Sequence, residues 1–104
     1  MKSPFRNLID LKVDKVVQVH DYIQLLFERE WVLNVYNDFK VTPNDELKKI
    51  QQMKLCQFSD ESDLIKLVFS EGQTLIVKMS KEAWHGPEAV SLKGPDNQTF
   101  VWNE

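Results

Sequence analysis

Cysteine, histidine and glycine are all scarce in this sequence, and each scarcity excludes a class of chemistry. The one cysteine, Cys56, cannot form an internal disulfide bond. Together with His20 and His85 it does not have the spacing of a zinc site. The three glycines form no glycine-rich phosphate loop, and neither a serine-hydrolase nor a metalloprotease motif occurs. We therefore predict no metal, no cofactor and no enzymatic activity.

Long apolar runs and an excess of basic residues are also missing. No stretch approaches the roughly 18 consecutive apolar residues of a membrane span, and the opening MKSPFRNLID has no signal-peptide pattern. We expect a cytoplasmic protein that contacts no membrane. The chain has 13 basic and 16 acidic residues, which argues against direct binding of nucleic acid and permits a cationic protein partner. Cys56 follows Leu55, and we expect it to pack in the core as a small apolar side chain.

What the sequence does contain is a series of short runs in which apolar residues alternate with polar ones. Such runs, rich in β-branched and aromatic residues, are typical of strands with one buried face. Gly72 suits the tight turn after Phe69, whereas the turn ERE at 28–30 has no glycine and is expected to form by another route. The predicted strands are 11–19, 22–28, 31–37, 53–58, 64–69, 74–79 and a final strand at 99–102.

The most informative feature is an internal repeat. IQLLFEREWVLNV, from Ile23, aligns with IKLVFSEGQTLIV, from Ile65, at an offset of 42 residues. Two hairpins with the same inward pattern would also look alike without duplication. Either interpretation predicts one mainly β domain over 1–104, with pseudo-repeats at about 8–37 and 50–79. Each repeat forms a three-stranded antiparallel meander, and the two make a small sandwich or barrel with one short helix and a C-terminal strand.

Two segments outside the meanders carry helix signals. Thr42 and Pro43 suit the N-cap and first position of a short helix or turn after 42, and Leu47 and Ile50 would share its apolar face. The N-terminal segment is expected to form an ordered arm or a helical turn that packs Phe5 on the core. The segment 81–98 reads as a long connection.

Candidate functional residues lie in the connectors. His85 and Glu88 flank Gly86-Pro87, where they could act as a general acid–base pair or simply help a rigid loop close the fold. Aromatic residues could line a ligand cup, although core packing is the better interpretation of Trp31. Acidic residues gather at the turns, either to meet a cationic partner or only as solvated turns. The predicted partner-binding set is Glu28, Glu30, Tyr36, Asp38, Asp60, Glu61, Asp63, Glu71, His85 and Glu88.

The segments WVLNVYNDF, LVFSEGQTLIV and GPEAVSL, with VW near the C-terminus, resemble small immunity proteins of bacterial toxin–immunity systems, including contact-dependent growth inhibition. The resemblance covers Phe27–Phe39, Leu67–Val77 and Gly86–Trp102. It implies a cytoplasmic protein that neutralises a cognate toxin domain, often a nuclease, by covering its active site or blocking substrate entry. Two alternatives stay open: a small-molecule-binding barrel or minor enzyme that uses His85 and Glu88, and a homodimer that pairs exposed sheet edges.

Overall fold

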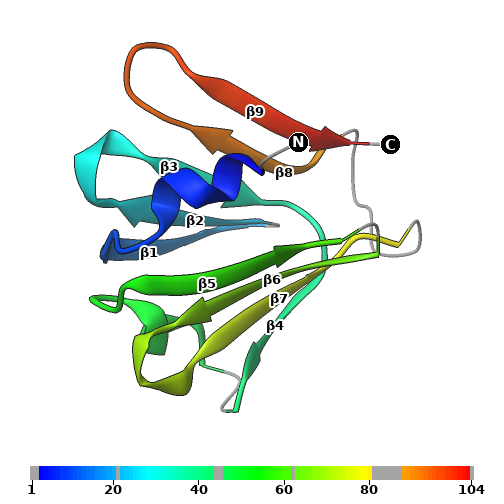
Figure 1. The fold of residues 1–104 in the computed structure, drawn as a ribbon. Helices are drawn as coiled ribbons and strands as arrows, with labels where there is room; N and C mark the ends of the chain where they lie inside the picture. The colour runs from blue at the N-terminus through cyan, green and yellow to red at the C-terminus, as the bar shows by residue number, and fades with distance from the viewer. Residues whose placement is uncertain (1–2, 21, 44–45, 62, 81–87, 104) are drawn as a thin grey trace.

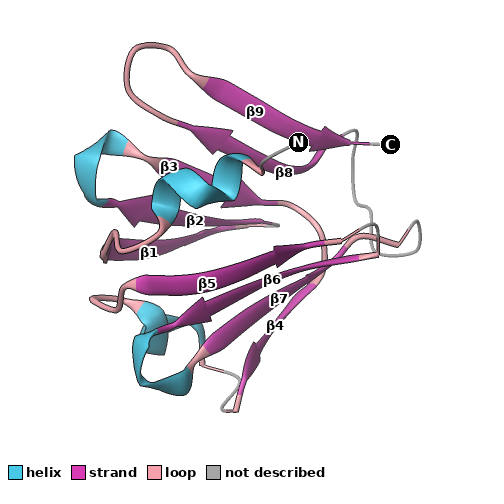
Figure 2. Cartoon of the chain, viewed as in Figure 1, coloured by secondary structure: helices cyan, strands magenta, loops and turns pink. Residues whose placement is uncertain are grey.

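The computed structural model describes residues 3–20, 22–43, 46–61, 63–80 and 88–103. Within these ranges its helical segments are short 3-10 turns, drawn in cyan in Figure 2, and it contains no α-helix. The strands are β1 Val13–Val19, β2 Tyr22–Phe27, β3 Val32–Val35, β4 Phe39–Thr42, β5 Leu55–Asp60, β6 Leu64–Phe69, β7 Thr74–Lys78, β8 Glu88–Lys93 and β9 Thr99–Asn103. The 3-10 turns are η1 Pro4–Leu8, η2 Glu28–Glu30, η3 Leu47–Ile50 and η4 Ser70–Gly72.

The strands form two antiparallel sheets that face one another across the core (Figure 1). One sheet has the order β1-β2-β3-β8-β9, and the other has the order β4-β7-β6-β5. The predicted mainly β fold is confirmed, and the two layers make it sandwich-like.

Alternation along the central strands places the core between the sheets. In β2 the side chains of Ile23, Leu25 and Phe27 are buried, and their neighbours in the chain are half-buried. Residues 65, 67 and 69 repeat this pattern in β6. Each such side chain contributes about 1.5–3 kcal/mol when it is fully buried. As predicted, the N-terminal segment forms a helical turn, η1, whose Phe5 and Leu8 are fully buried against this core.

The sequence repeat is also present in the backbone. The register shift in β1 lies between Val13 and Lys15, and the shift in β5 lies between Leu55 and Gln57, at the same offset of 42 residues. Hydrogen bonds between the halves are reciprocal: the Asp10 N–H donates to the Leu55 carbonyl at 2.8 Å, and the equivalent Gln52 N–H donates to the Val13 carbonyl at 2.6 Å. Lys12 and Lys54 occupy equivalent positions and pair with each other in an isolated bridge. The two halves are therefore related by an approximate two-fold axis that passes near this pair.

Two strands were not predicted, and both cross from one half to the other. β4 leaves the first half and pairs with β7, with Phe39 opposite Val77. β8 follows the second half and pairs with β3, with Val90 opposite Val35. Because residues 35 and 77 are equivalent, Phe39 and Val90 are equivalent too. The predicted meanders thus exchange their fourth strands. Neither strand is evident from the sequence. Residues 89–92 of β8 are all buried and show no alternation, and β4 has only four residues.

Three further local predictions were wrong. Thr42 does not cap a helix but ends β4, a cis peptide bond joins it to Pro43, and η3 begins only at Leu47. The turn at 28–30 was expected to form by another route than the turn at 70–72, which contains Gly72, but the two have the same backbone conformation. Arg29 and Glu30 have φ of 60° and 67°, and the equivalent Glu71 and Gly72 have φ of 63° and 82°.

Cys56 is exposed rather than buried in the core. Adjacent residues of a strand face opposite sides, so its neighbour Leu55, which is fully buried, takes the inward position.

Candidate functional site

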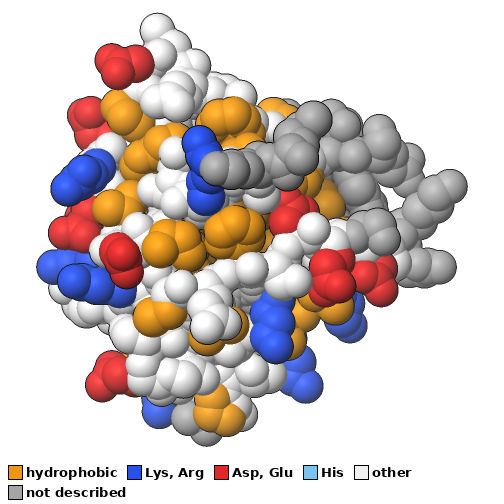
Figure 3. All heavy atoms as spheres, viewed as in Figure 1, with side chains coloured by type: hydrophobic (Ala, Val, Ile, Leu, Met, Phe, Trp, Pro, Cys, Tyr) orange, Lys and Arg blue, Asp and Glu red, His pale blue; other side chains and the backbone are white. Residues whose placement is uncertain are grey.

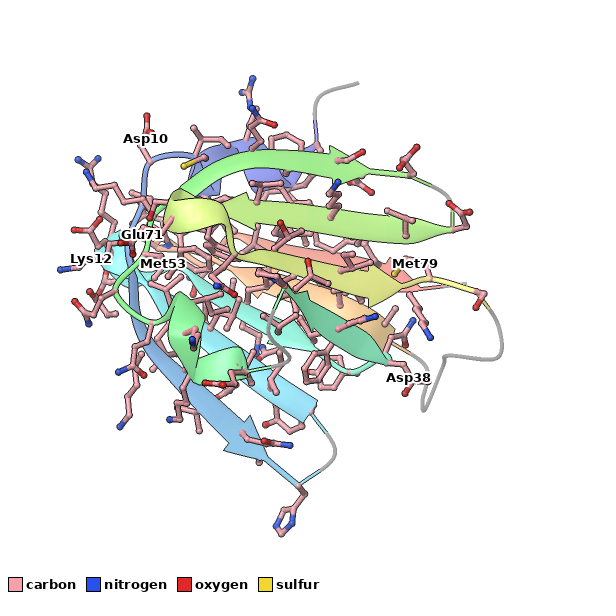
Figure 4. The ribbon with its side chains drawn as sticks, turned by 90° about the horizontal axis from the view of Figure 1, so that it is seen from below. Asp10, Lys12, Asp38, Met53, Glu71 and Met79 are labelled. Carbon is pink, nitrogen blue, oxygen red and sulfur yellow. The ribbon has the colours of Figure 1, made fainter. Side chains whose placement is uncertain are left out.

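The predicted binding residues separate into two groups at opposite ends of the sandwich. Glu28, Glu30 and Glu71 lie in the equivalent turns η2 and η4. Figure 4 shows Glu71 at one end with Asp10 and Lys12, and Asp38 with Met79 at the other. Tyr36, Asp38, Asp60, Glu61 and Asp63 belong to this second end. His85 lies outside the described residues, and so does the side chain of Glu88, whose backbone begins β8 opposite Asn103.

The first end, around η2 and η4, carries both signs of charge. The Glu28 carboxylate accepts the Lys12 backbone N–H at 2.7 Å, and the Lys12 ammonium lies 4.0 Å from the Asp14 carboxylate. A cavity of about 560 Å³ opens here, and its wall includes Asp10, Arg29 and Lys54 beside Trp31. Because cations stand among the carboxylates, this end does not present a strongly negative surface to a partner.

The second end is the more negative one, and its backbone is held by the end of β7. The Lys78 N–H donates to the Asp38 carbonyl at 2.9 Å, and the Met79 N–H donates to the Asp63 carbonyl at 2.9 Å. Acidic side chains gather where β5 turns into β6 (Figure 3). We call Asp38, Asp60, Glu61 and Asp63 the acidic end; all four residues are exposed.

Asp60 has a structural role within the acidic end. One of its carboxylate oxygens accepts the Ser3 hydroxyl at 2.8 Å and the Trp102 indole N–H at 3.3 Å. It therefore ties η1 and β9 to β5. The exposed carboxylates of Glu61 and Asp63 are better candidates for contacts with a partner.

The outer face of the five-stranded sheet is uncharged in the part that adjoins the acidic end, whereas Lys15, opposite Leu26, and Lys93, opposite Val32, lie further along the same face. The strand registers place one uncharged row across all five strands, and the tilted rings of Tyr22 and Tyr36 lie next to it, with centroids 4.9 Å apart. Among the described side chains, this row and the tyrosine pair carry no charged group. We call them the uncharged face: Val17, Tyr22, Gln24, Asn34, Tyr36, Ser91 and Val101. Asn34 and Ser91 are buried within it, and the other five side chains reach the surface.

Comparison of the two halves shows that folding does not require an uncharged residue at every position of this face. Positions equivalent to Gln24, Tyr36 and Ser91 lie on the outer face of the other sheet, where they are Lys66, Lys78 and Lys40. All three lysines are exposed. Ser91 is buried in its own sheet, only 2% exposed, so burial already explains its lack of charge. Gln24 and Tyr36 are half-buried, and at their two positions the scaffold accepts lysine whereas the five-stranded sheet has none. The centre of a protein interface is typically poor in charged residues and rich in tyrosine.

The described residues contain no group of three or more histidine, cysteine or carboxylate side chains placed to hold a metal ion. None of the helical segments in the described ranges has the length and apolar character to cross a membrane. The predicted acid–base pair at His85 and Glu88 is not tested, because its side chains lie outside those ranges.

Comparison with known proteins adds no relative: no family model matches the chain, and neither a curated protein nor a solved structure does. The functional argument must therefore rest on the surfaces of this chain. Sequence reasoning found the acidic turns but missed the uncharged face. The sequence did contain a sign of the uncharged face. Outward positions of the predicted strands, which are usually charged, are occupied there by glutamine, tyrosine and valine.

Proposed function

We propose that this chain is an immunity protein that binds a cationic toxin domain and neutralises it. The uncharged face forms the centre of the interface, and the acidic end forms its charged margin. The observation that carries the proposal is the contrast at two accessible positions: Gln24 and Tyr36 are uncharged, and their equivalents in the other sheet are Lys66 and Lys78. A fold that tolerates lysine at these sites has kept them neutral only on the face that carries the tyrosine pair.

The physical steps of binding follow from these two surfaces. Exposed carboxylates at the acidic end attract a cationic domain over several ångströms and raise its association rate. The tyrosines and neighbouring aliphatic side chains then lose water against the partner, at an interface of about 800 Å² per protein. A nuclease is a suitable target because its substrate groove must be cationic to bind phosphates. Occupation of that groove, or of the approach to it, blocks the substrate without any chemistry by the inhibitor.

The test measures binding of the chain to the toxin domain encoded next to its gene. Three double variants each change the net charge by the same amount. Gln24→Lys with Tyr36→Lys alters the uncharged face, Glu61→Gln with Asp63→Asn alters the acidic end, and Glu30→Gln with Glu71→Gln alters the opposite end. Circular dichroism should show that all three fold, since equivalent positions already carry lysine or lie in exposed turns.

Each variant has a different expected result. The face variant should weaken affinity by at least about thirtyfold, as expected for loss of an interface hot spot. The acidic-end variant should slow association by roughly tenfold at low salt and leave dissociation unchanged. The opposite-end variant should bind like the parent chain and rescue cells from the toxin equally well. No binding by the parent chain, or equal losses in all three variants, would reject the proposal.

A further inference from the structure

The approximate two-fold symmetry of the fold is broken at one edge. β9 covers the outer edge of β8 in the five-stranded sheet. The equivalent of β8 in the other sheet is β4, and it is the edge strand of that sheet. No described residue pairs with its outer side. The edge of β8 is thus covered by a strand, whereas the equivalent edge of β4 is not. The way β9 binds to β8 indicates what kind of strand could bind to β4.

The open edge of β4 presents unpaired backbone groups in the same register as β8. The Lys78 N–H donates to the Asp38 carbonyl, just as the equivalent Tyr36 N–H donates to the Ala89 carbonyl, each at 2.9 Å. Bonding direction alternates along an antiparallel strand, so the N–H and C=O groups of Phe39 and Val41 point away from β7. These two residues correspond to Val90 and Leu92, which face β9.

In the filled half, β9 contributes one large anchor, Trp102. It pairs with Val90 and turns its side chain toward the inner face of the sheet. Its ring stacks on Phe5 with centroids 4.6 Å apart, and its indole N–H reaches the Asp60 carboxylate. Phe58 completes the aromatic wall, with its ring centroid 6.1 Å from that of Phe5.

In the other half, a cavity stands at the place that corresponds to the Trp102 site. Its volume is about 540 Å³, which is within the usual range of small-ligand sites, about 300–1,000 Å³. Leu47 replaces Phe5, Val16 replaces Phe58, and the amide of Gln18 replaces the Asp60 carboxylate as a hydrogen-bond acceptor. Phe39, the equivalent of Val90, also lines this cavity, and so do Glu46 and Lys48, whose ammonium donates to the Val16 carbonyl at 2.8 Å. The site is therefore built like the Trp102 site but contains no aromatic anchor from a neighbouring strand.

We propose that the outer edge of β4 and this cavity bind an extended segment of a partner protein, which adds as a tenth strand. The segment follows the pattern of Phe100, Val101 and Trp102 in β9. An apolar residue lies opposite Val41, and an aromatic residue opposite Phe39 enters the cavity. The middle position lies opposite Lys40, whose exposed ammonium favours a carboxylate there. The segment thus has the order apolar, acidic, aromatic. This binding mode is strand addition to a sheet edge, and it does not depend on the toxin-binding proposal.

A designed peptide tests the site directly. The probe is a capped hexapeptide with the sequence of residues 98–103 of this chain and the change Val101→Glu. Amide shifts on titration should localise to Phe39, Val41 and Leu47, without changes in β8. A peptide with Val101→Lys should bind about three- to tenfold more weakly. A peptide with Trp102→Ala should lose at least about tenfold in affinity because its anchor is absent.

Variants of the chain make the test specific. Lys40→Glu should reverse the preference between the glutamate and lysine peptides, whereas Lys66→Glu, which changes the same charge on an inner strand of the sheet, should not. Leu47→Trp fills the cavity and should abolish binding while the protein stays folded. The proposal is wrong if the glutamate peptide does not bind at millimolar concentration or only displaces β9 from β8. It is equally wrong if Lys40→Glu leaves the preference unchanged, or if the free chain forms a dimer through β4.

Discussion

Gly94→Ala should destabilise the protein through one steric contact. A Cβ atom at Gly94 would lie 2.6 Å from Cη2 and Cζ3 of Trp31 and 2.8 Å from its Cε3. The Trp31 ring has little room to move, since only 7% of this residue is exposed. The backbone of Gly94 is also held, because its N–H donates to the Gln98 carbonyl at 2.9 Å. The added methyl group must therefore displace either the ring or the β8–β9 turn.

Extra volume in a well-packed core costs about 1–3 kcal/mol. In a domain of about 100 residues, each kcal/mol lowers the melting temperature by about 4–8 °C. We expect Gly94→Ala to lower the free energy of unfolding by about 2 kcal/mol, measured by urea denaturation and checked by thermal melting.

Gly72→Ala provides the matched control. Gly72 has φ of +82°, and a Cβ atom there would meet nothing within 4 Å. Gly72→Ala should lower the free energy of unfolding by about 1 kcal/mol, because alanine adopts this backbone conformation less readily than glycine. In a Trp31→Phe background, whose shorter side chain lacks the outer ring of the indole, Gly94→Ala should lose most of its effect and Gly72→Ala should keep its own. Equal costs of Gly94→Ala in the two backgrounds would refute the steric argument.

Three other results are expected. Glu30→Gly should raise the free energy of unfolding by about 0.5–1 kcal/mol, because glycine adopts φ of 67° without strain, and Gly72→Glu should lower it comparably in the same urea assay. Asp60→Ala removes the acceptor of both the Ser3 hydroxyl and the Trp102 indole, so it should cost about 1–2 kcal/mol and alter the near-ultraviolet circular dichroism of Trp102; an unchanged spectrum would contradict this. Cys56 is exposed, so one equivalent of a thiol reagent should react with the folded protein as fast as with a short peptide, and protection until unfolding would show that the side chain is covered.

The strands with one buried face were the predictable part of this fold. β2 and β6 alternate so clearly that Ile23 and Ile65 define both the inner face and the repeat. β8 escaped prediction because it lies between β3 and β9, where even Ser91 is buried. A strand buried on both faces has no alternation to detect. β4 is too short to stand out from the turn residues on either side of it.

The functional surfaces were harder to predict for a different reason. Carboxylates in connectors are visible in the sequence, but the sequence does not show which connectors share an end. Glu28 and Glu71 do meet at one end, as the repeat implies, but Lys12 and Lys54 from outside those turns meet there as well. The neutral outer face needs strand register to be recognised, because Gln24, Asn34 and Ser91 come from three strands that only pairing brings into one row.

The exchange of β4 and β8 determines how the two halves depend on each other. Neither half can complete a four-stranded sheet from its own residues, because β7 needs β4 and β3 needs β8. Buried apolar residues on β3 and β7 would otherwise lie at exposed edges, which favour aggregation. The halves must therefore fold together, through pairings distant in sequence, and the fold gains one cooperative core instead of two small ones. The two sheets then differ in their surfaces because β9 is added to only one of them. It covers the edge of β8, extends the uncharged row of the outer face to five strands, and has no counterpart beside β4 among the described strands.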